Sequence, residues 1–199
     1  MDVVVLPDLS DPDALLIRAS WDDPDRFAAL YDRYAAQLYR YAYRRIGAAA
    51  AEDVVAEAFL AAFRRRHTYD LSRPDARPWL FGILTRELGR HERAERAHYR
   101  ALARSAASST PADSPADAVV DRVSAGAARN QLAAALAALP ARDRDVLLLV
   151  AWGDFAYGDV ASALDIPVGT VRSRLNRARR KVRDALGPTS TERTSNDGH

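Results

Sequence analysis

Apolar residues recur every three or four positions along most of the chain, a spacing that places them on one face of a helix. In the first half, this pattern predicts a helix from Asp25 to about Ile46 and a second from about Ala49 to Arg66. A third helix is predicted to start near Pro78, after a loop that runs from Thr68 to Arg77. No convincing alternation of apolar and polar residues predicts a strand.

The second half of the chain shows the same periodicity after a change of composition. Residues 105–126 are rich in Ala, Ser, Asp, Thr and Pro, which is typical of a linker. Beyond them, helices are predicted at residues 131–139, 143–152 and 157–164, and in the stretch that ends near Leu186. The predicted fold is all-α, two small helical domains joined by a flexible linker: an acidic N-terminal lead at residues 1–24, a first domain at 25–104, the linker at 105–126, a second domain at 127–186 and a disordered tail at 187–199.

The end of the second domain has the pattern of a helix-turn-helix. A short apolar helix is followed by the breaker Asp165-Ile166-Pro167, in which Asp165 is expected to adopt the left-handed conformation. In the helix that follows, Val171, Leu175, Ala178 and Val182 form a single apolar stripe. The opposite face carries side chains that can read base edges and neutralise phosphates in a major groove. The candidate DNA-binding residues are Thr170, Arg172, Ser173, Asn176, Arg177 and Arg180.

A basic amphipathic helix taken alone is more often a solvated surface than a DNA-binding element. Here the short helix and tight turn before it favour DNA binding, because together they form the unit that places a helix end in the major groove. The distribution of charge agrees, although the net charge is only +2. Seven aspartates stand against one arginine up to Asp25, whereas seven basic residues stand against one aspartate in Val168–Leu186.

Composition disfavours several other classes of protein. The chain has no cysteine, which excludes disulfides and thiolate zinc sites. It has no run of about eighteen apolar residues and its start is acidic, so we expect no membrane span, no signal peptide and a cytoplasmic location. Glu87, His91, Glu95 and His98 share one helix face, but structural zinc sites usually draw ligands from more than one element, so we expect no metal and no cofactor. An enzyme is not expected, since there is no Gly-rich phosphate loop, activated nucleophile or apolar carboxylate pair.

Two motifs in the second half are LPARDRDVLLL (139–149) and PVGTVRSRLNRAR (167–179), and two in the first half are AEDVVAEAF (51–59) and RPWLFGI (77–83). The first pair resembles region 4, and the second pair region 2, of the extracytoplasmic-function (group IV) sigma factors of RNA polymerase. The resemblance implies a sigma factor that binds core RNA polymerase and directs promoter recognition and transcription initiation. Region 4 would bind the −35 element and the β flap, while region 2 would bind the β′ clamp coiled coil and open the −10 element.

The resemblance also assigns residues within region 2. The family's polymerase-binding helix falls on Asp53, Ala56 and Glu57, with Ala56 where the family usually has Gln. The loop 68–77 corresponds to the family's pocket for an unstacked −10 base, which a closed duplex cannot present. Where the family commonly has Arg-Asn, this chain has Thr85-Arg86-Glu87. An anti-sigma factor is implied as a further partner. The candidate −10 contacts are Arg73, Arg77, Trp79, Arg86 and Arg90, although a tryptophan at a helix start is more often a core residue.

Two other functions fit part of this pattern. A helix-turn-helix regulator acting without polymerase predicts a sensor or phospho-acceptor domain at the N-terminus, where helices resembling region 2 stand instead. A sigma-like decoy that binds polymerase without initiating is compatible with the departures at Ala56 and Glu87. A separate hypothesis is autoinhibition, in which the tethered domains and the acidic N-terminus limit promoter binding until polymerase spreads the chain.

Overall fold

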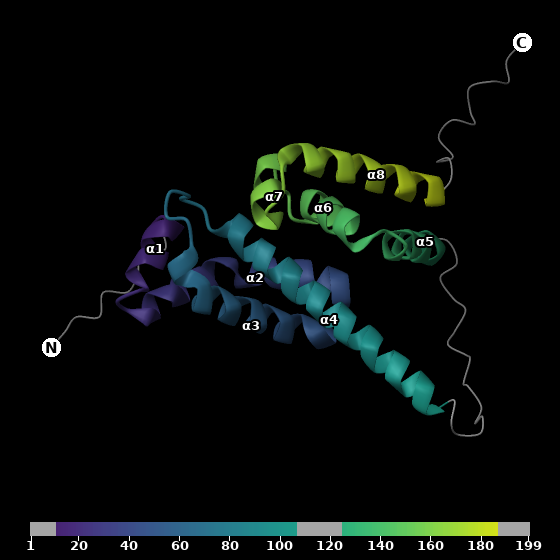
Figure 1. Ribbon diagram of the computed structural model, residues 1–199, viewed down its shortest axis with the longest axis horizontal. Helices are drawn as coiled ribbons and strands as arrows, with labels where there is room; N and C mark the ends of the chain where they lie inside the picture. Colours follow the sequence, from purple (N-terminus) through teal and green to yellow (C-terminus); the bar gives the residue numbers. More distant parts are fainter. Residues whose placement is uncertain (1–10, 107–124, 187–199) are drawn as a thin grey trace, which may run out of the picture.

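The computed structural model describes residues 11–106 and 125–186, and this part of the chain consists of helices and connecting loops without a strand (Figure 1). The all-α prediction is therefore confirmed. Residues 1–10, most of the predicted linker (107–124) and the predicted tail (187–199) lie outside the described residues. The elements in chain order are α1 (Asp13–Ala19), η1 (Pro24–Phe27), α2 (Ala28–Ile46), α3 (Ala48–Arg65), η2 (Arg66–Thr68), α4 (Arg77–Ala106), α5 (Ala125–Ala137), α6 (Ala141–Trp152), α7 (Tyr157–Leu164) and α8 (Val168–Leu186).

The first domain contains α1 to α4, and its helix boundaries follow local sequence signals. The side chain of Asp23 accepts a hydrogen bond from the N–H of Asp25, as expected of a cap, but residues 24–27 form a 3₁₀ turn and α2 begins only at Ala28. Gly47 ends α2 with a φ of +79°, a conformation that glycine adopts without steric cost. The helices α2, α3 and α4 pack against one another around a buried apolar cluster.

The structure differs from the sequence prediction at the N-terminus. The segment assigned to an acidic lead contains the helix α1, and Leu16 and Ile17 of this helix are buried in the core of the first domain. Asp13, its first residue, is only 2% exposed. A seven-residue helix next to Pro12 shows too little of the helical period to be recognised in a sequence rich in aspartate.

The second domain contains α5 to α8 and has the helix-turn-helix that its sequence predicts. Asp165 closes α7 with φ 53° and ψ 55°, the left-handed conformation expected for it. The stripe of Val171, Leu175 and Ala178 is buried against the rest of the domain, so the opposite face of α8 is turned to solvent. In Figure 1, α8 lies on the side of this domain that faces away from α2 and α3.

The two domains pack against each other, mainly through α4 and α7 (Figure 1). Most of the buried apolar residues of the two domains form one continuous cluster, in which Phe81 and Phe155 meet edge to face with ring centroids 4.9 Å apart. Gly82 permits this approach, because a Cβ added there would collide with the backbone carbonyl oxygen of Ala163. The periodicity of the sequence contains no information on this interface.

Candidate nucleic-acid interface

The outer face of α8 presents the side chains that the sequence pattern selected. Arg172, Ser173, Asn176, Arg177 and Arg180 are exposed, and Thr170 is half-buried at the start of the helix. The hydroxyl of Ser173 donates to the carbonyl oxygen of Thr170 at 3.0 Å. Guanidinium and amide groups at these positions can make paired hydrogen bonds to guanine and adenine, and the outer arginines can contact phosphates.

One contact to this face was not found by sequence reasoning. Asp143, in the first turn of α6, is almost fully buried, and its Oδ2 lies 3.8 Å from Nε of Arg177. A cleft of about 560 Å³ beside it is lined by Pro140, Arg142, Thr170 and Arg174, among others. Asp143 therefore attracts the guanidinium of Arg177 toward the body of the domain, at a distance too long for a hydrogen bond.

The loop between η2 and α4 holds the first of the candidate −10 residues. Arg73 is exposed and forms an ion pair with Asp70, with Nε and Oδ2 3.2 Å apart. Hydrogen bonds from the hydroxyl and the N–H of Ser72, followed by Arg73, lower the pKa of Asp70. The hydroxyl of Tyr69 donates to the carbonyl oxygen of Arg73 at 2.7 Å, so the loop has a defined shape.

Trp79 is half-buried and packs on the core of the first domain, as a tryptophan at a helix start usually does. Its ring meets that of Tyr69 at an angle of 61°, with centroids 5.0 Å apart. A cavity of about 300 Å³ next to it is lined on one side by Pro74 and Pro78 and on the other by Asp159 and Ser162 of α7. The second domain thus forms one wall of the space beside the loop.

Arg77 lies between the two domains instead of on an open surface. Its Nε donates to Oε1 of Gln37 at 3.1 Å, and its Nη2 donates to the carbonyl oxygen of Gly153 in the second domain. Its guanidinium also stacks over Phe155, 4.2 Å from the ring centroid. In this arrangement the groups of Arg77 that could hold a DNA strand are occupied by the second domain.

Arg86 and Arg90, the remaining candidates on α4, differ in their surroundings. Burial, and then the nearby charge of Arg65, lower the pKa of Arg86. Arg90 is exposed and donates to Oε2 of Glu87 at 2.7 Å, while Glu87 is largely buried. Glu87, the residue that departs from the family pattern, therefore neutralises one of the candidate DNA-binding arginines.

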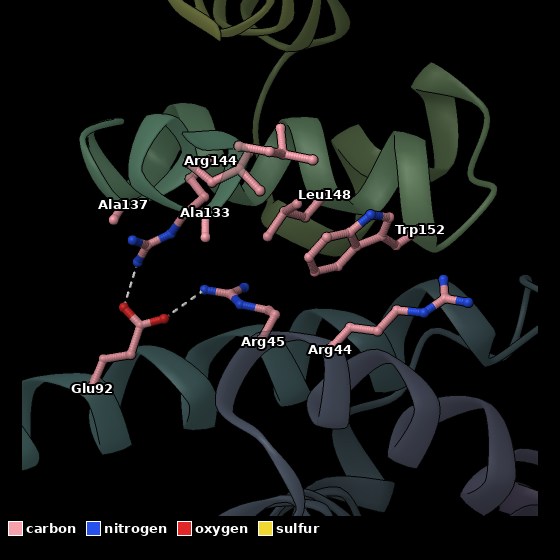
Figure 2. Close-up of a pocket in the computed structure, with 10 residues that line it drawn as sticks. Arg44, Arg45, Glu92, Ala133, Ala137, Arg144, Leu148 and Trp152 are labelled. Atoms are coloured by element: carbon pink, nitrogen blue, oxygen red, sulfur yellow. Dashed lines mark hydrogen bonds and ion pairs between the residues drawn. The ribbon is translucent and has the colours of Figure 1, made fainter. Parts of the chain in front are cut away.

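A buried network of charges joins the domains further along α4 (Figure 2). Arg45 of α2 is 3.0 Å from Oε1 of Glu92 on α4 and 2.9 Å from Oδ1 of Asp145 on α6. Arg144 of α6 also pairs with Glu92, as the dashed lines in Figure 2 show. Burial raises the pKa of Asp145, and the charge of Arg45 opposes that shift. The side chain of Arg45 is only 3% exposed, so its positive charge depends on these carboxylates.

The polymerase-binding residues that the resemblance predicted lie on a different surface. Asp53, Ala56 and Glu57 are exposed on α3. Asp53 and Ala56 border a groove of about 500 Å³ between α2 and α3, which Tyr31 and Tyr39 line from the other side. The spacing of these tyrosines along the chain does not predict the groove, because helical spacing does not show which faces of two helices meet.

None of the helices in the described ranges, 11–106 and 125–186, is long and apolar enough to cross a bilayer. No group of three or more His, Cys, Asp or Glu side chains in the same ranges is arranged to hold a metal ion.

Two family models match this chain, one for each domain. The model described as Sigma-70 region 2 matches residues 30–98, and that described as Sigma-70, region 4 matches residues 129–182. The ECF RNA polymerase sigma factor SigL of Mycobacterium tuberculosis is 37% identical over 160 residues, which cover 79% of this chain and 87% of SigL. SigW of Bacillus subtilis is 30% identical over 170 residues, covering 82% and 90% of the two chains.

Solved structures with the same arrangement of helices include CnrH in complex with the cytosolic domain of CnrY. That match has a TM-score of 0.59 and 26% identity, and it covers 86% of this chain and 95% of CnrH. The sigma factor RpoE of Bartonella quintana, in complex with the anti-sigma factor NepR, matches with a TM-score of 0.52 and 23% identity over 80% of this chain and 96% of RpoE, which supports the fold. With regions 2 and 4 in order and relatives matched over most of their length, this chain belongs to the extracytoplasmic-function sigma factors.

Proposed function

We propose that this chain is a group IV sigma factor that binds core RNA polymerase in the cytoplasm and directs transcription initiation, with region 2 at the −10 element and region 4 at the −35 element. The observation that carries the proposal is the exposed polar face of α8, which begins directly after the left-handed turn at Asp165. This is the geometry that inserts the start of a recognition helix into a major groove.

At the −35 element, we assign base reading to the start of α8 and phosphate binding to its later turns. Arg172 and Asn176 offer the paired donors and acceptors that distinguish guanine and adenine. Arg177 and Arg180 follow on the same exposed face, and neutralising phosphates would give affinity that falls with salt. We assign Thr170 and Ser173, which are hydrogen-bonded to each other, to hydrogen bonds with the DNA backbone or base edges.

For region 2, we assign the exposed face of α3 to the β′ clamp coiled coil. Asp53 and Glu57 supply negative charge there, and the groove beside Asp53 and Ala56 offers an apolar floor with tyrosine hydroxyls. Ala56 is smaller than the family's usual Gln and cannot hydrogen-bond through its side chain. At this position polymerase would therefore be contacted by packing alone. The β flap is assigned to region 4.

Region 2 is also assigned the capture of an unstacked −10 base by the loop 68–77. The proposed contacts to the opened strand are Arg73 and Trp79, which line the same cavity, and Arg77, Arg86 and Arg90 along α4. In the free chain, Arg77 donates a hydrogen bond to region 4, and residues of region 4 line one side of the adjacent cavity. This packing supports the autoinhibition hypothesis: polymerase would have to separate the domains before the −10 residues can act.

An anti-sigma factor is the further partner we propose. The solved structures of CnrH and RpoE are complexes with CnrY and with the anti-sigma factor NepR, respectively. A partner of this kind would hold the chain away from polymerase until it is released.

Run-off transcription by core polymerase on a promoter library, with and without this chain, tests the proposed function. Initiation should appear only with the chain present, and Asp53→Arg should abolish it while the −35 duplex is still bound, because the change reverses charge on the polymerase-facing surface. Asp22→Arg is the control, since Asp22 is an exposed acid on the connection after α1. Absence of initiation with intact DNA binding would favour a regulator without polymerase, and polymerase binding without initiation would favour a decoy.

A further inference from the structure

One carboxylate of the acidic N-terminal segment is buried inside region 2. Asp13 pairs with the guanidinium of Arg33, and its Oδ2 accepts hydrogen bonds from the hydroxyl of Tyr34 at 2.6 Å and from the N–H of Ala76 at 2.7 Å. Burying a carboxylate is costly unless its oxygens are paired and hydrogen-bonded, and here both oxygens have partners. The acceptor for Ala76 therefore comes from a helix 63 residues earlier in the chain.

These contacts fix the end of the loop 68–77 from its inner side. Ala76 is fully buried, so without Asp13 its N–H would lack this charged acceptor. The neighbouring Asp75 accepts a hydrogen bond from the N–H of Arg77 at 2.8 Å, and its Oδ1 lies 3.3 Å from the hydroxyl of Tyr34. Burial and then the carboxylate of Asp13 raise the pKa of Tyr34, so its hydroxyl stays protonated and donates at neutral pH.

We propose that Asp13 is a positioning residue for promoter opening: it holds the loop 68–77 in the shape that receives the unstacked −10 base. The inference rests on the proposed function of region 2. Asp13 touches no DNA itself and acts through Ala76 and Tyr34. A loop fixed in advance loses less conformational entropy when it captures a base, and a loop shifted by an ångström captures it poorly.

The test measures the affinity of reconstituted holoenzyme for two probes. One is a single-stranded oligonucleotide with the −10 element of a promoter found by run-off transcription, and the other is a duplex with only its −35 element. Asp13→Ala should weaken −10 binding about tenfold, the effect of about 1.4 kcal/mol for one charge-assisted hydrogen bond. Binding to core polymerase and to the −35 duplex should not change.

Matched variants separate positioning from general stability. Asp13→Asn should retain more −10 affinity than Asp13→Ala, because its carbonyl oxygen can still accept from Ala76. Tyr34→Phe keeps the ring and removes only the bridging hydroxyl, so it should weaken −10 binding by a smaller factor, about threefold. Asp22→Ala removes an exposed acid from the same segment and should behave as the wild type.

Three outcomes would overturn the inference. These are unchanged −10 binding by Asp13→Ala, equal losses for the −10 and −35 probes, or no gain of Asp13→Asn over Asp13→Ala. If Asp13→Ala does not fold, as thermal unfolding would reveal, unchanged −10 binding by Tyr34→Phe overturns it instead. Failure of the wild-type holoenzyme to bind the −10 probe would reject the proposed function of region 2 and the inference with it, whereas a failure confined to the variants rejects the inference alone.

Discussion

Four of the candidate DNA-binding arginines, two in each region, differ in whether other residues of the chain already hold their guanidinium groups. Arg172 and Arg180 of region 4 project from the exposed face of α8. In region 2, Arg77 is held by Gly153 and Phe155 of the other domain, and Arg90 is held by Glu87. Arg172 and Arg180 are thus available at the proposed −35 interface, whereas Arg77 and Arg90 are occupied at the proposed −10 interface.

This difference indicates the order in which the two interfaces can be used. Each contact of Arg77 with region 4 stabilises the packing of the two domains by about 0.5–2 kcal/mol. Separating the domains therefore has a moderate free-energy cost. The groove beside Asp53 and Ala56 lies on α2 and α3, away from these contacts, and polymerase could reach it while the domains are still packed. Binding there could therefore precede exposure of the proposed −10 residues.

Breaking the buried charge network should have the largest effect on the packing of the two domains, and so on the difference between the two interfaces. Arg45→Met leaves Asp145 without its closest cation, which should destabilise the packed arrangement by about 3 kcal/mol. Since the chain has no cysteine, dyes can be attached through Asp22→Cys and Asp184→Cys, and energy transfer between them should fall. Acidification should restore it: the pKa of Asp145 is raised by burial in the packed state, so that state binds a proton more readily than the open one.

Arg44→Met is the matched control for this experiment. Figure 2 shows the guanidinium of Arg44 directed away from the pairs that Arg45 makes with its neighbours. The control removes one charge from the same helix and should leave energy transfer unchanged. Equal effects of the two variants would mean that net charge, and not the buried network, holds the domains together.

Gly82→Ala should separate the domains without harming region 2 itself. The added Cβ would collide with the backbone of Ala163 in region 4, and overpacking of this kind costs about 1–3 kcal/mol. The free chain should then show a larger radius of gyration in solution scattering and bind the single-stranded −10 probe more tightly.

Gly89→Ala, on the same helix, provides the control for Gly82→Ala. A Cβ at Gly89 would meet only the end of the Arg93 side chain, at an ordinary distance of 3.5 Å. Alanine stabilises a helix by about 1 kcal/mol relative to glycine at both positions. A difference in compactness between the two variants would therefore come from the interface between the domains. A compact Gly82→Ala chain would contradict the packing described here.

At the exposed interface of region 4, Arg172→Ala and Asn176→Ala should relax the −35 sequence preference. Each should cost about 1–3 kcal/mol on the preferred sequence and much less on sequences with the contacted base pair changed. Binding to a panel of single-base variants of the −35 duplex measures this. Equal losses across the panel would assign these residues to phosphate binding.

The smallest effect is expected from Arg183→Ala, near the end of α8. It should weaken duplex binding uniformly across the same panel and reduce the slope of log affinity against log salt by about 1. A titration of affinity with salt measures the slope. A change in sequence preference would contradict the assignment of Arg183 to the phosphate backbone.

Much of the second domain could be predicted from the sequence, because its signals are local. The stripe of Val171, Leu175 and Ala178 identifies the buried face of α8, so the exposed face follows from 100° per residue. Asp165 adopts the left-handed turn since its short polar side chain tolerates it. The DNA roles of the exposed residues remain predictions.

The first domain was harder to predict because its informative contacts are distant in sequence. Asp13 appeared to belong to an acidic lead, and no local pattern indicates that its carboxylate accepts a hydrogen bond from the N–H of Ala76. The second domain has one such contact too, because Asp143 reaches Arg177 from another helix. A carboxylate that serves as a buried acceptor and one that is solvated have the same sequence signature.

By itself, the sequence determined the helical class, the helix-turn-helix and the two-region resemblance, since periodicity and motifs record which residues of one helix share a face. Only the tertiary structure decided which faces meet. It placed Arg77 against Phe155, Gly82 against Ala163 and Arg45 between the domains. The physical reason is that burial and pairing here depend on contacts between residues far apart in the sequence. Such contacts produce no periodic pattern along the chain.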